Sequence, residues 1–102
     1  MRFVVAVVKP AQVESVRQAL AAMHVTRLTV CDVHGYAAAT SEEVRQEVML
    51  EIAVNDDFVD RTVRTLVAAL DTGGGPEAAR IFVLPMDAAV QIYRTVRGPE
   101  AI

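Results

Sequence analysis

The segment LTVCDVHGY, residues Leu28–Tyr36, decides the fold. Its β-branched residues favour an extended backbone, and Gly35 near its end permits a turn or a close approach. After a short polar connection at 37–46, the segment Val48–Val54 alternates apolar with other residues, including Glu51. Such a period of two is typical of a half-buried strand. The pattern predicts a hairpin of two strands, and we expect this hairpin to carry the function.

The residues before the hairpin predict a strand and a helix. Arg2–Val8 is a continuous apolar run, typical of a strand covered on both faces, and Lys9-Pro10 ends it because proline cannot donate to a ladder. Apolar residues then recur at three- and four-residue intervals, which predicts an amphipathic helix. They are Val13, Val16, Leu20 and Met23.

The residues after the hairpin repeat this order. Asn55-Asp56-Asp57 predicts a helix start, with Asn55 supplying a side-chain acceptor for free backbone amides. The predicted apolar face of that helix consists of Phe58, Val63, Leu66, Val67 and Leu70. Gly73-Gly74-Gly75-Pro76 breaks the helix, and Ile81–Leu84 is the fourth strand, closed by Pro85. An Asp87–Gln91 turn and an arginine-bearing tail follow.

The connection within the hairpin carries a local signal of its own. Thr40, followed three residues later by Glu43, matches a capping box and predicts one helical turn.

The predicted order is therefore β-α-β-β-α-β. Two split βαβ units give an α+β, ferredoxin-like sandwich, a four-stranded antiparallel sheet with two helices on one face. The other sheet face is left uncovered, and it is apolar. We therefore expect the chain to associate with itself through that face.

Composition bounds the function classes. The chain has 102 residues, which predicts a single domain over 1–102, and 53% of them are hydrophobic, a surplus that favours an oligomer. Net charge is −3, without a basic patch for nucleic acid. No apolar run is long enough for direct membrane insertion, and no signal peptide is expected. A single cysteine, Cys31, fits the reducing cytoplasm.

An ordered set of short motifs resembles the PII signal-transduction proteins and their PII-like relatives. The motifs span nearly the whole chain, and they are VVKP at 7–10, VRQAL at 16–20, LTV at 28–30, VHGY at 33–36, EIAVNDD at 51–57, RIFVLP at 80–85 and EAI at 100–102. The resemblance implies a trimer with a nucleotide in each of three clefts between subunits.

The resemblance also implies which residues bind the nucleotide. Carried over position by position, they are Thr29, Gly35, Tyr36, Gly73, Gly74, Gly75, Arg80, Arg94 and Arg97. The residue types suit phosphate, because glycines let backbone N–H groups approach the oxygens and arginines supply charge with bidentate geometry. Without the resemblance, the residues favour a plainer interpretation: the glycines are a helix stop with a flexible turn, and the arginines are solvated tail charges.

Three departures from the family pattern are visible. The long loop after the second strand is reduced to 37–46, so we expect neither the plugging of an ammonium channel nor the chelation of magnesium–2-oxoglutarate. Pro76-Glu77-Ala78-Ala79 replaces a Gly-Asp-Gly run, and Arg80 replaces a lysine, which keeps the charge but changes the geometry. Gln91 and Tyr93 stand where two arginines are expected.

The leading hypothesis is a cytoplasmic, homotrimeric PII-like regulator rather than an enzyme. It would bind an adenine nucleotide (ATP, ADP or AMP), alone or with a small anion such as bicarbonate, and report that state to a partner protein such as a transporter. No catalytic cofactor is expected, because no nucleophile–base or metal–water set can be assembled.

Two alternatives stay open at this point. One is a metal-binding trimer resembling the CutA proteins, for which His34 and Asp32 share a strand face with Cys31 opposite and His24 nearby. The other is a ligand-free trimer that acts only by protein contact.

Overall fold

A computed structural model describes residues 1–25, 27–70 and 79–102. The elements are β1 (Arg2–Val8), η1 (Pro10–Gln12), α1 (Val13–Ala22), β2 (Thr29–Gly35), β3 (Arg45–Val54), η2 (Asp56–Phe58), α2 (Val59–Leu70), β4 (Arg80–Pro85), β5 (Val90–Gln91), β6 (Val96–Arg97) and η4 (Gly98–Ala101). Among these residues no helix is long and apolar enough to span a membrane.

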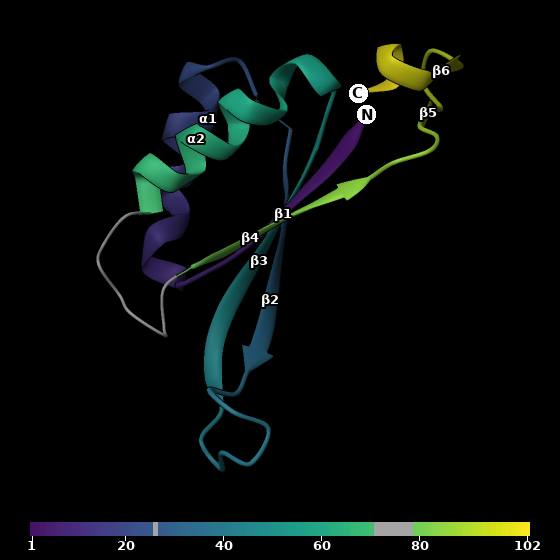
Figure 1. Cartoon of the computed structure of the whole chain (residues 1–102). Coiled ribbons are helices and arrows are strands. Elements are labelled where there is room, and N and C mark those ends of the chain that lie inside the picture. Colours follow the sequence, from purple (N-terminus) through teal and green to yellow (C-terminus); the bar gives the residue numbers. More distant parts are fainter. Residues whose placement is uncertain (26, 71–78) are drawn as a thin grey trace.

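The main sheet has the strand order β2-β3-β1-β4, and every neighbouring pair is antiparallel. Figure 1 shows α1 and α2 side by side on one face of this sheet. The ferredoxin-like prediction is therefore confirmed. The sheet extends past the helices at one end, where β2 and β3 continue as a protruding hairpin.

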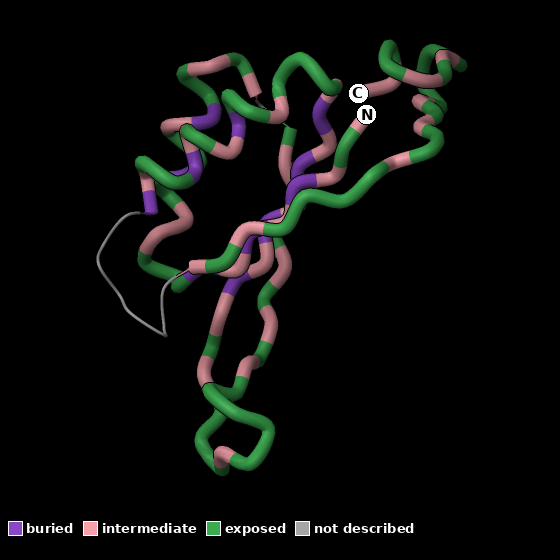
Figure 2. Tube along the Cα trace, viewed as in Figure 1, coloured by how far each residue is buried: buried purple, intermediate pink, exposed green. Residues whose placement is uncertain are grey.

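The core lies between the helices and the central strands, as the buried positions in Figure 2 show. Alternation along β1 and β3 sends every second residue under the helices. The buried apolar residues are Val4, Ala6, Val8, Val16, Leu20, Val48, Leu50, Ile52, Val54, Leu66 and Leu70. The predicted apolar face of α1 is confirmed, with Val13 and Met23 packed at its edges.

The opposite sheet face, here called the open face, has no helix over it. Phe3 lies opposite Leu84 and Val5 opposite Phe82, so these four side chains share a face with each other and not with the buried Val4. Phe82 is 50% exposed and Leu84 43%. This apolar surface runs across β1 and β4.

The orientation of α2 differs from the prediction. Thr62, Leu66 and Leu70, spaced by four, are buried, whereas Val67 is 52% exposed and Phe58 37%. The predicted face was therefore wrong at Phe58 and Val67. Phe58 precedes α2 in η2, where the Arg61 guanidinium lies 5.2 Å from its ring centroid.

The connection between β2 and β3 also differs. β3 begins at Arg45, three residues before the predicted strand, so the connection is residues 36–44. The predicted helical turn is absent there, because the Glu43 amide is bonded to Ser41 Oγ (3.3 Å) instead of joining a capping box with Thr40. After β4, the predicted Asp87–Gln91 turn is wrong at its end, because Val90–Gln91 form the strand β5, which pairs with β6 in a small hairpin whose turn is residues 92–95. The short helix η4 follows this hairpin.

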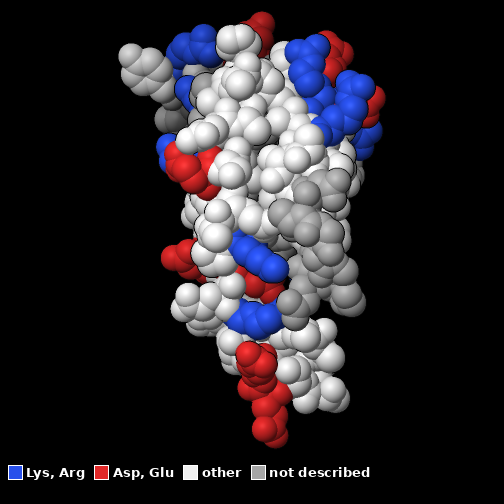
Figure 3. Space-filling model, turned by 90° about the vertical axis from the view of Figure 1, so that its left-hand side faces the viewer, with Lys and Arg blue, Asp and Glu red and all other residues white. Residues whose placement is uncertain are grey.

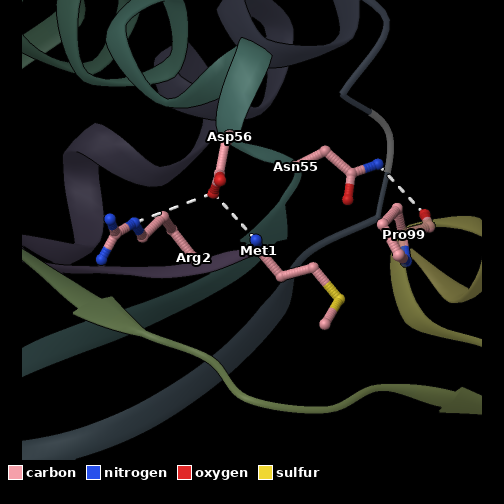
Figure 4. Close-up of polar contacts among 5 residues, drawn as sticks. All are labelled: Met1, Arg2, Asn55, Asp56 and Pro99. Carbon is pink, nitrogen blue, oxygen red and sulfur yellow. Dashed lines mark hydrogen bonds and ion pairs between the residues drawn. The ribbon is translucent and has the colours of Figure 1, made fainter.

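Polar contacts hold the two chain ends beside the start of η2 (Figure 4). The Met1 amine donates to Asp56 Oδ1 at 2.8 Å, and Arg2 Nε lies 3.8 Å from the same oxygen. Asn55 Nδ2 donates to the Pro99 carbonyl at 3.0 Å. Asn55 therefore precedes the helix as predicted but does not cap it, since its side chain ties η4 to the end of β3.

Candidate functional site

The described residues predicted to bind a ligand lie in two groups at opposite ends of the molecule. Gly35 ends β2 and Tyr36 begins the 36–44 connection, while Arg80 begins β4 beside the end of β1. Arg94 and Arg97 lie in the β5–β6 hairpin at the far end (Figure 1). Arg80 and Arg94 line two separate cavities that share no lining residue, so one chain does not bring the two groups together. Thr29 is exposed at the start of β2, opposite Glu51, and belongs to neither group. The three predicted glycines, Gly73, Gly74 and Gly75, lie outside the described residues.

A cavity of about 410 Å³ lies at the first end, and we call it the hairpin-base pocket. Its described lining comes from the end of β1, the start of η1, the start of β3 and the start of β4. Charged groups come from Lys9, Arg45, Glu47 and Arg80. Figure 3 shows basic and acidic surface in contact on the helix-bearing side of the molecule, between the helices and the acidic tip. Three basic side chains in a concave site suit a multiply charged anion.

Glu47 is the unexpected member of this pocket. Its Oε1 lies 3.6 Å from Arg45 Nη2, and its Oε2 lies 4.0 Å from Arg80 Nη2. The side chain is only 15% exposed, and a Cβ added at Gly35 would collide with its carboxylate. Gly35 therefore permits the close approach of a side chain from the neighbouring strand, as its position in the sequence predicted.

A second cavity, of about 320 Å³, lies beside the β5–β6 hairpin, and we call it the C-terminal pocket. It is lined by His24, Arg27 and Arg94, with Phe58 and Asn55 among its other residues. Arg94 is held by a 2.7 Å hydrogen bond from its Nε to Gln91 Oε1. No aspartate or glutamate side chain is among the described lining residues, so this pocket too suits an anion.

The metal alternative finds no ligand set in the described part of the chain. Asp32 and His34 are exposed on β2, opposite Val48 and Gln46, and no group of three His, Cys, Asp or Glu side chains is placed to hold an ion. Cys31 donates to Glu51 Oε1 at 3.6 Å. Desolvation raises the pKa of the Cys31 thiol, and the hydrogen bond to Glu51 raises it further. The raised pKa favours the protonated thiol over the reactive thiolate.

Sequence reasoning missed Lys9, Arg45 and Glu47 in the first pocket and His24 and Arg27 in the second. Arg80, Glu47 and Gly35 come from three strands, and only the sheet register brings them to one place. A signal was nevertheless available. Glu47 lies on the strand face that Glu51 shares, and the earlier start of β3 puts Arg45 two residues before it on that same face.

Comparison with known proteins gives a consistent result. A family model described as nitrogen regulatory protein P-II matches residues 1–97. The nitrogen regulatory protein P-II of Rhizobium etli is 33% identical over 113 residues, covering 100% of both chains. The nitrogen regulatory protein GlnK1 of Methanosarcina mazei is 32% identical over 114 residues, covering 100% of this chain and 97% of that one. The crystal structure of Arabidopsis thaliana PII bound to citrate superposes with a TM-score of 0.86 at 29% identity, covering 98% of this chain and 87% of that one.

Proposed function

Because the chain belongs to the nitrogen regulatory protein P-II family, we propose that it is a cytoplasmic, homotrimeric regulator that binds an adenine nucleotide in clefts between its subunits. The relatives are regulatory proteins by name, so the activity is signalling rather than catalysis. The nucleotide is ATP, ADP or AMP, and the regulated protein is a partner such as a transporter.

The observation that carries the proposal is the separation of two basic pockets in one chain. The hairpin-base pocket holds Arg80 and the C-terminal pocket holds Arg94, at opposite ends. A cleft built from the first pocket of one subunit and the second pocket of its neighbour would bring both to a single ligand. A closed ring of head-to-tail contacts supplies such a cleft at every junction.

Two further features support association. The open face presents Phe82 and Leu84 to solvent in a single chain, and the β5–β6 turn presents Ile92 and Tyr93 at 90% and 94% exposure. Contiguous apolar surface of this kind is typical of an interface. Packing the open faces together around an axis would cover β1 and β4 and leave the helices outside.

The signal would pass through the hairpin. The last pair of its ladder is Gly35 and Arg45, of which Arg45 lines the hairpin-base pocket, and its tip carries the exposed residues 37–40. A phosphate held at the base would therefore change the position of the exposed tip that a partner contacts.

The test is a calorimetric titration with ATP, ADP and AMP, alongside light scattering. We expect a mass three times the 11.1 kDa of one chain and heat with at least one nucleotide. Arg80→Ala and Arg94→Ala should each weaken binding about tenfold or more, since each removes a charge-assisted contact. Arg64→Ala, on the exposed side of α2 and outside both pockets, is the matched control. Absence of heat with all three nucleotides would refute the proposal.

A further inference from the structure

The charge arrangement of the hairpin-base pocket points to a regulatory role for Glu47. Among the described lining residues, Lys9, Arg45 and Arg80 are basic, and Glu47 alone is acidic. Each oxygen of the Glu47 carboxylate lies nearest a different arginine. The carboxylate therefore already occupies the position between two guanidinium groups that an incoming anion would take.

These contacts are weak enough to be exchanged. Charge-assisted N–H···O bonds are about 2.7–2.9 Å long, whereas Glu47 lies 3.6 Å from Arg45 and 4.0 Å from Arg80. The Glu47 Oε1 atom is buried and has no hydrogen-bond donor among the described residues. A buried oxygen without a hydrogen bond is costly, so the side chain gains by moving out when another anion replaces it.

We propose that Glu47 is an internal competitor for the phosphate site, and that it selects polyphosphate ligands over singly charged anions. This inference rests on the proposed nucleotide function for its biological meaning. A carboxylate carries one negative charge, so a single charge such as that of bicarbonate gains little by displacing it. A di- or triphosphate carries more negative charge, so it interacts more strongly with Lys9, Arg45 and Arg80 and displaces the Glu47 carboxylate.

Displacement of the Glu47 carboxylate also affects the hairpin formed by β2 and β3. Glu47 packs over Gly35 at the end of β2 and pairs with Arg45 at the start of β3. Displacement of the carboxylate removes a contact from both strands where they enter the 36–44 connection. Glu47 is thus a positioning residue whose release accompanies ligand binding.

The test uses tripolyphosphate, which needs the basic pocket but no base-recognition site. We expect Glu47→Gln to bind it about tenfold more tightly than the wild type, since one competing charge near two arginines is lost. The same variant should also gain affinity for orthophosphate, so that the preference for the longer anion shrinks. Glu51→Gln, on the same strand face but outside the pocket, is the matched control and should leave tripolyphosphate affinity unchanged.

The outcomes separate this inference from the proposed function. If ATP binds the wild type but Glu47→Gln gains nothing for tripolyphosphate, the inference is wrong and the function stands. If no nucleotide binds the wild type yet Glu47→Gln gains tripolyphosphate affinity, the competitor role stands and the function fails. An equal gain in Glu51→Gln would show a general charge effect and overturn the inference. Glu47→Ala replaces Glu47→Gln if the latter does not fold.

Discussion

At the scale of single residues, the fold tolerates a few polar atoms that it does not satisfy. Thr62 on α2 is completely buried, and its Oγ1 has no hydrogen-bond partner among the described residues. Burial removes this hydroxyl from water, and no hydrogen bond within the protein compensates for the lost hydration. Thr62 is therefore retained at some cost to stability.

Replacement of Thr62 by valine, which has the same shape, should stabilise the protein. We expect the free energy of unfolding to rise by about 1 kcal/mol, because the buried hydroxyl is removed without leaving a cavity. Urea denaturation of the two proteins measures the difference. A loss of stability in Thr62→Val would mean that the hydroxyl has a bonding partner.

Asp56 makes the opposite kind of contact, since both Met1 and Arg2 approach its carboxylate. The hydrogen bond from the Met1 amine, and then its charge, lower the pKa of Asp56. A carboxyl whose folded pKa is depressed contributes stability above its unfolded pKa, about 3.9, and loses it as pH falls through the folded pKa. The contribution is small because Asp56 is largely exposed.

Because the pKa of Asp56 is lowered in the folded protein, its contribution to stability should disappear in acid. Asp56→Asn should lower the melting temperature slightly at pH 7, and the difference from the wild type should vanish as the pH falls below the folded pKa of Asp56. Asp57→Asn, which removes the same charge from the same turn, is the control. A deficit in Asp56→Asn that is as large in strong acid as at pH 7 would contradict the ion pair.

At the scale of elements, periodicity in the sequence gave correct results where one face dominates. The α1 face and the alternation of β3 predict the observed burial, because packing follows those patterns directly. The apolar run of β1 predicted a strand covered on both faces, and this was wrong for the single chain, in which only Val4, Ala6 and Val8 are buried. The α2 face was misassigned because Val63 and Val67 offer a second apolar stripe beside Thr62, Leu66 and Leu70. Which of these two stripes is buried depends on how α2 packs against the rest of the fold, and the local sequence pattern does not specify that packing.

Paired substitutions test that orientation of α2. Leu66→Ala should cost about 2–5 kcal/mol of unfolding free energy, since Leu66 is fully buried and truncation leaves a cavity. Val67→Ala should cost under about 0.5 kcal/mol, because half of Val67 faces solvent. Equal losses, measured by chemical denaturation, would mean that α2 is rotated from its described position.

Candidate site residues were harder to predict than elements. The resemblance named Gly35, Arg80 and Arg94 as binding residues, but it indicated neither their separation in one chain nor the carboxylate between Arg45 and Arg80. That carboxylate belongs to Glu47, which shares a strand face with Glu51. Its proximity to Arg80 is a consequence of the three-strand register of β4, β1 and β3.

At the scale of the whole molecule, the exposed apolar surface of the single chain supports the proposed trimer. The open face of β1 and β4 carries Phe82 and Leu84, which are 50% and 43% exposed in the single chain. Burial of such side chains contributes about 25 cal/mol for each square ångström removed from water. Self-association is the direct way for this chain to gain it.

A charge on the open face should dissociate the assembly. Phe82→Asp would require each interface to bury a carboxylate, so light scattering should report the 11.1 kDa monomer in place of the trimer. Val67→Asp, which puts the same charge on the exposed side of α2, should leave the mass unchanged. A trimer that survives Phe82→Asp would place the interface elsewhere.

The most direct test of the shared cleft is a mixing experiment with two variants that are each defective in nucleotide binding. Arg80→Ala damages the hairpin-base pocket and Arg94→Ala damages the C-terminal pocket. After unfolding and refolding together in equal amounts, about one quarter of the clefts would combine an intact pocket from each subunit, so calorimetry should recover about one quarter of the wild-type sites. Recovery of no sites, from a mixture shown to form trimers, would mean that the two arginines do not meet across a subunit junction.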